Sequence, residues 1–91
     1  MDGRLIYFCD FSNELITRME TLYEGGEKTN SMQISLTDMW TISDQYLEDS
    51  YDFIDELNSG LQKLVCKFIR SLTLKRCKSI RDKAENFIHG K

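Results

Sequence analysis

The stretch LTDMWTISDQYLEDSYDFIDELNSGLQKLVCKFIRSL, residues 36–72, decides the fold. Apolar residues recur along it at intervals of seven: Trp40, Leu47, Ile54, Leu61 and Phe68. Residues seven apart lie on the same side of a helix because they are separated by two turns. The spacing therefore predicts one long amphipathic helix over residues 37–72.

A break at Asn58-Ser59-Gly60 is the alternative, because such a triplet often ends a helix. A loop has no reason to preserve the helical angle, so a break should shift the apolar phase. The phase does not shift, since Leu61 and Phe68 continue the face that Ile54 belongs to. We therefore expect a continuous helix, in which Gly60 costs about 1 kcal/mol relative to alanine.

The predicted length of this helix favours association with another chain. Thirty-six residues at about 1.5 Å each give a helix of about 54 Å. A compact domain of 91 residues has a diameter of only about 30 Å. The helix would project beyond the body unless flanking helices or a partner cover its ends. The sequence thus predicts a homo- or hetero-oligomer.

The segments on either side are expected to be helical too. Residues 4–24 place apolar side chains such as Leu5, Phe8 and Leu15 on one face, which predicts a medium helix that ends at the glycines following residue 24. The alternative is a strand over residues 5–9, followed by a helix that Ser12 caps. Residues 32–36 alternate apolar and polar side chains, as a short extended segment would.

Three pairs of residues have the spacing of a capping box, which marks the start of a helix. The pairs are Ser35 with Asp38, Thr41 with Asp44, and Ser79 with Asp82. The first two fit the start of the long helix. The third would open a short C-terminal helix over residues 80–88, after a basic turn at residues 73–78. The predicted fold class is all-α, in a single domain over residues 1–91.

The order of these elements resembles the outline of a histone fold. A medium helix is followed by a loop with an extended piece, a long helix, a basic turn and a short capped helix. The resemblance implies an obligate heterodimer and contact between DNA and the basic turn.

Charge is distributed very unevenly, although the net charge is only -3. Residues 1–62 carry three bases against thirteen acids, and residues 63–91 carry nine bases against two acids. Two groups stand out on the predicted long helix and the turn after it. The acidic ridge is Asp44, Glu48, Asp52 and Glu56; the basic patch is Lys63, Lys67, Arg70, Lys75, Arg76 and Lys78. The ridge suits a basic partner, the patch suits phosphates, and two antiparallel copies would complement each other.

No residue pattern indicates an enzyme or a cofactor. Cys9, Cys66 and Cys77 are an odd number without close pairing, which is typical of a reducing compartment rather than a disulfide scaffold. They do not form a zinc site with His89, because the spacing lacks a close ligand pair. No apolar run is long enough to cross a membrane. We expect an intracellular protein without metal, cofactor, small-molecule substrate or membrane contact.

The leading functional hypothesis is a non-catalytic interaction or assembly subunit that binds a protein through its apolar seam. The predicted interface residues are Trp40, Leu47, Tyr51, Ile54, Leu61, Val65, Phe68 and Leu72. The alternative is a histone-fold-like subunit that binds nucleic acid through the basic C-terminal third.

Overall fold

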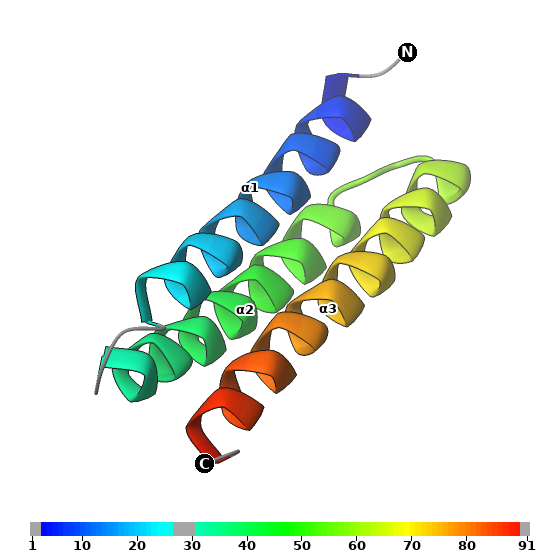
Figure 1. The fold of residues 1–91 in the computed structure, drawn as a ribbon. Helices are drawn as coiled ribbons and strands as arrows, with labels where there is room; N and C mark the ends of the chain where they lie inside the picture. The colour runs from blue at the N-terminus through cyan, green and yellow to red at the C-terminus, as the bar shows by residue number, and fades with distance from the viewer. Residues whose placement is uncertain (1–2, 27–30, 90–91) are drawn as a thin grey trace.

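Three helices form an antiparallel bundle in the computed structural model, which describes residues 3–26 and 31–89. They are α1 (Gly3–Gly26), α2 (Ser31–Asp55) and α3 (Gly60–His89). Figure 1 shows that α1 and α3 run in one direction and α2 in the other, and each helix packs against the other two. There is no strand in these two ranges. The all-α prediction is confirmed.

Helix α1 is continuous, so the alternative of a strand over residues 5–9 is wrong. Its core-facing residues alternate at intervals of three and four, which keeps them on one side of a helix. Phe8, Ser12, Leu15 and Met19 are buried along this side. The helix ends at Gly26, in agreement with the predicted end. A β-carbon on Gly26 would lie 2.9 Å from Met32 Cε, so the bare backbone permits close contact with the start of α2.

Helix α2 begins at Ser31, so the extended segment predicted at residues 32–36 is wrong. Met32, Met39 and Tyr46 are buried at intervals of seven, which shows that the buried face starts before residue 36. Ser35 and Thr41 lie inside the helix and do not start it. The rest of the predicted connection, residues 27–30, lies outside the described residues.

The continuous helix predicted over residues 37–72 is wrong, because α2 ends at Asp55 and α3 begins at Gly60. Ser59 caps α3: its Oγ accepts a hydrogen bond from the backbone N–H of Gln62 at 3.3 Å. The seven-residue spacing of apolar residues continues across the break, but the residues on its two sides are not buried to the same extent. Ile54 is 2% exposed and Leu61 is 71% exposed, so the two residues lie in different environments.

Helix α3 runs without interruption through the predicted turn at residues 73–78 and the predicted separate helix at residues 80–88. Ser79 is therefore an interior residue and does not cap a helix. The buried residues of α3 are Cys66, Thr73, Cys77 and Ala84, separated by seven, four and seven positions. These side chains are small or weakly hydrophobic, and their helical periodicity is therefore faint in the sequence.

These helices do not have the outline of a histone fold. They contain 24, 25 and 30 residues, so the middle helix is not a long one between shorter neighbours. The bundle measures 49 × 17 × 17 Å, and its long dimension matches the roughly 45 Å of a 30-residue helix. No helix projects beyond its neighbours by the predicted amount, so helix length no longer argues for a partner.

Candidate interaction surface

Four large apolar side chains form a row on the outer face of α3, which we call the α3 stripe. Leu61, Leu64, Phe68 and Leu72 are 71%, 66%, 65% and 47% exposed. Intervals of three, four and four residues keep them on one side of the helix. Val65 lies beside them and is partly buried. The first half of α3 therefore has apolar residues on its outer face as well as on the face that packs against the core, where Cys66 and Ile69 lie.

The other predicted interface residues are on α2 and occupy different environments. Ile54 lies in the hydrophobic core, and Leu47 is partly buried. Trp40 and Tyr51 are about half exposed. The structure thus divides the predicted seam into a core residue, residues beside α3, and the exposed stripe on α3.

Two arginines of α3 stack on two aromatic rings of α2. The Arg81 guanidinium carbon lies 3.9 Å from the Trp40 ring centroid, and that of Arg70 lies 4.3 Å from the Tyr51 centroid. The two arginines are eleven residues apart on α3, and the two aromatic residues are eleven residues apart on α2. The equal spacing is expected for two helices that run antiparallel side by side. Arg81 Nη1 also donates a hydrogen bond to Ser43 Oγ at 2.9 Å. The sequence did not predict these contacts, because the spacing of the four residues indicates stacking only if α2 and α3 are known to be antiparallel neighbours.

The opposite charges of the chain meet between α2 and α3. Helix α2 carries six acids and no base, and α3 carries eight bases and two acids. Asp44 lines the groove between them together with Lys75 and Lys78. The complementarity that suggested two antiparallel copies is therefore already present within one chain.

The acidic ridge and most of the basic patch remain at the surface. Asp44, Glu48, Asp52 and Glu56 are all exposed. In the basic patch, Lys67, Lys75, Arg76 and Lys78 are exposed. Lys63 Nζ donates to the carbonyl oxygen of Asp55 at 3.5 Å, and Arg70 is partly buried against Tyr51. Lys78 Nζ also lies 4.0 Å from Asp82 Oδ2, one turn along α3, so the structure leaves Lys67, Lys75 and Arg76 as the bases that are open to a partner.

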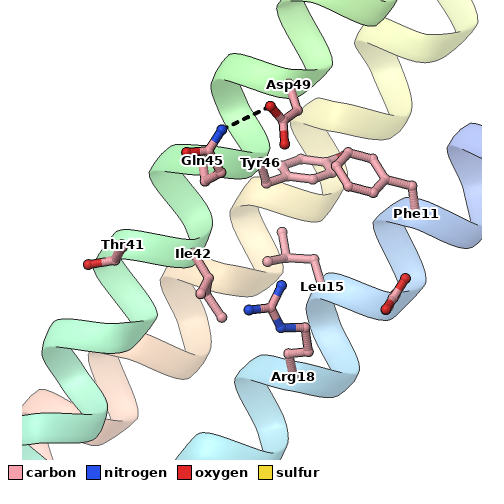
Figure 2. Close-up of a pocket in the computed structure, with 9 residues that line it drawn as sticks. Phe11, Leu15, Arg18, Thr41, Ile42, Gln45, Tyr46 and Asp49 are labelled. Carbon is pink, nitrogen blue, oxygen red and sulfur yellow. Dashed lines mark hydrogen bonds between the residues drawn. The ribbon is translucent and has the colours of Figure 1, made fainter.

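A groove between α1 and α2 has a volume of about 300 Å³ (Figure 2). Apolar side chains from both helices, including Leu15 and Ile42, line it. Its polar lining is mixed in charge, and Gln45 Nε2 donates to Asp49 Oδ1 at 2.9 Å across one turn of α2. Arg18 shares this lining with acids, so the groove offers neither a clear anion site nor a pair of groups arranged for proton transfer.

The cysteines are free thiols, and two of them are fully buried. Burial raises the pKa of the Cys66 thiol and raises that of Cys77 from 9.0 to about 11. Both are therefore uncharged at neutral pH, which does not suit a nucleophile. Within residues 3–26 and 31–89, no three His, Cys, Asp or Glu side chains are grouped to hold a metal ion. His89 is exposed at the end of α3.

In the same part of the chain, no helix has the length and apolar character needed to cross a membrane. Compared with known proteins, the chain matches no protein-family model, no curated protein and no solved structure. Its surface is therefore the basis for a functional proposal.

Proposed function

We propose that this chain is a non-catalytic interaction or assembly subunit that binds a protein partner through the α3 stripe. The exposed row of Leu61, Leu64, Phe68 and Leu72 carries the proposal. Complete burial of one such side chain is worth about 1.5–3 kcal/mol. A contiguous exposed apolar row on a small domain is typical of a binding site.

The geometry of the stripe supports this function. Its residues belong to a single helix, so they form a preorganised ridge and need no rearrangement before binding. An amphipathic partner recognises such a row with anchors at helical spacing. Trp40 and Tyr51, which the sequence also assigned to the interface, already cover arginines of α3. We therefore restrict the proposed surface to α3.

Site-specific photo-crosslinking tests the proposal in the cells that make the protein. A benzoylphenylalanine at position 68 should form a discrete covalent adduct with another polypeptide. The same probe at position 34 is the control, because Ile34 is equally exposed at 68% but lies on α2. Adducts that are identical from both positions, or absent from both, would contradict the proposal.

The alternative proposal is nucleic-acid binding through the exposed bases of the basic patch. Lys67, Lys75, Arg76 and Lys78 are exposed, and no acid occurs between Gly60 and Arg81. Binding to duplex should then weaken steeply with salt, because each neutralised phosphate releases counterions. A titration at two salt concentrations, with Lys75→Ala and Arg76→Ala variants, checks this. Salt-independent behaviour, or indifference to the substitutions, would dismiss it.

A further inference from the structure

The partner of the α3 stripe can be specified further from the charges that surround it. Lys75 lies three residues after Leu72 and extends the stripe by almost one turn. Lys67 and Arg76 lie on its two sides, and both are exposed. The stripe is thus an apolar row with a basic border along α3.

The stripe is short, which limits the shape of its partner. Leu61 and Leu72 are eleven residues apart, or about 16 Å along a helix axis. That distance equals three turns. A second helix laid along α3 would cover the stripe with residues spaced at three and four, as in other cases where a helix binds along an apolar row.

A second copy of this chain does not have the right surface. Pairing α3 with α3 would place basic borders against each other, since the first acid of this helix is Asp82. Like charges across an interface disfavour that pairing. The acidic row of α2 has the opposite charge, but the exposed aromatic side chains beside it, Trp40 and Tyr51, already stack on arginines of α3 in the same chain.

We propose that the α3 stripe binds an acidic amphipathic helix of three to four turns, supplied by another protein. This inference rests on the proposed function and adds the chemistry of the partner. Apolar residues of the partner helix cover Leu61, Leu64, Phe68 and Leu72, and its flanking carboxylates lie near Lys67, Lys75 and Arg76. Apolar contact supplies most of the affinity, and the charges select the partner.

Two synthetic peptides test this inference directly. The first is an 18-residue helix with Leu at positions 4, 7, 11 and 15, Glu on both flanks and Ala elsewhere. The second replaces each Glu with Lys. Labelled peptide is titrated with the full chain and fluorescence anisotropy is recorded. We expect the acidic peptide to bind at least about tenfold more tightly at low salt, and the difference to shrink as salt screens the charges.

Matched variants locate the binding site. Phe68→Ser should abolish binding of the acidic peptide, whereas Ile34→Ser removes an equally exposed apolar side chain from α2 and should leave it unchanged. Lys75→Glu should reduce the preference for the acidic peptide. Lys83→Glu, on the same helix but farther from the stripe, should not. Circular dichroism of each variant confirms that the helices are retained.

Several results would overturn the inference. They are equal binding of both peptides, binding of neither, stripe-dependent dimerisation in sedimentation, or stripe-dependent binding to phosphatidylserine vesicles in place of the peptide. A position-68 crosslink to another polypeptide, together with any of these peptide results, would leave the proposed function standing and reject only the acidic helix. Loss of the crosslink would reject the function itself.

Discussion

The hydroxyl groups of Ser12 and Tyr46 lie 2.7 Å apart and share a buried hydrogen bond between α1 and α2. Desolvation raises the pKa of Tyr46, which keeps its phenol neutral and available for this bond. Phe11 packs against the same ring, with a centroid distance of 5.0 Å. A polar contact is thus enclosed by an aromatic cluster.

The first prediction concerns this hydrogen bond. Tyr46→Phe should lower the free energy of unfolding by about 1–2 kcal/mol, because it leaves the Ser12 hydroxyl buried without this partner. Ser12→Ala in the same background should then cost little more, since both polar groups are gone. Urea unfolding followed by the fluorescence of the single tryptophan measures both effects. Fully additive losses would show that the two hydroxyls are not coupled.

The second prediction compares two adjacent glycines at the end of α1. Gly26→Ala should destabilise the bundle by about 1–2 kcal/mol, since the new β-carbon would lie 2.9 Å from both Met32 Cε and Ser35 Oγ. Gly25 has nothing within 4 Å of such a carbon, so Gly25→Ala should stabilise by up to about 1 kcal/mol through helix propensity. Thermal unfolding followed by circular dichroism distinguishes them. Equal shifts in Tm would contradict the close contact at Gly26.

The third prediction concerns alkaline pH. Burial raises the pKa of Cys77 from 9.0 to about 11, so the unfolded thiol ionises before the folded one. Between these pH values the unfolded state binds fewer protons, and stability falls as pH rises. The Cys77 contribution to this loss should be about 1 kcal/mol by pH 10, which is about half of what two pKa units correspond to. Urea midpoints at pH 7.5 and pH 10 under reducing conditions should differ less in Cys77→Ala than in the unmodified chain.

The fourth prediction distinguishes two residues that occupy the same position in successive heptads of the sequence. Ile54→Asp should unfold the bundle, because it places a carboxylate at a position that is 2% exposed. Leu61→Asp should change stability by less than about 1 kcal/mol, because the residue is exposed and lies in the first turn of α3, where an acid is favourable. It should nevertheless weaken binding of the acidic peptide. If both variants unfolded, the result would support the continuous apolar seam predicted from the sequence and contradict the different environments of the two residues.

The sequence predicted the helical class and the extent of α1 well, because large apolar residues mark its buried face. For α2, the sequence predicted a buried face through Trp40 and Leu47, whereas the buried residues are their neighbours Met39 and Tyr46. Trp40 and Leu47 are more hydrophobic than Ser43 and Ser50, yet the serines are buried and Trp40 is half exposed. Small residues such as Ser43 and Ser50 are buried where neighbouring helices come close. Which face of a helix is buried there depends on tertiary packing, and the hydrophobicity of single residues does not show it.

The helix break was missed because its four-residue connection preserves the heptad count in the sequence. A signal for it was present: Ser59 and Gln62 have the spacing of a capping box, and the Gln62 N–H does donate to Ser59 Oγ. The contacts of Arg70 and Arg81 with aromatic rings could not be predicted, since they require the antiparallel pairing of α2 and α3. Three residues of the α3 stripe, Leu61, Phe68 and Leu72, were among the interface residues predicted from their spacing, and Leu64 was not.

The buried face of α3 combines small and large side chains. Cys66, Thr73 and Ala84 are buried there, and Ile69, Leu74 and Phe87 pack against the core while partly buried. Local detachment of α3 would expose this face and let its amide protons exchange with solvent. A partner bound to the outer face of α3 would slow that exchange in proportion to its occupancy. Binding of a partner to α3 and local detachment of α3 from the bundle are thus thermodynamically coupled.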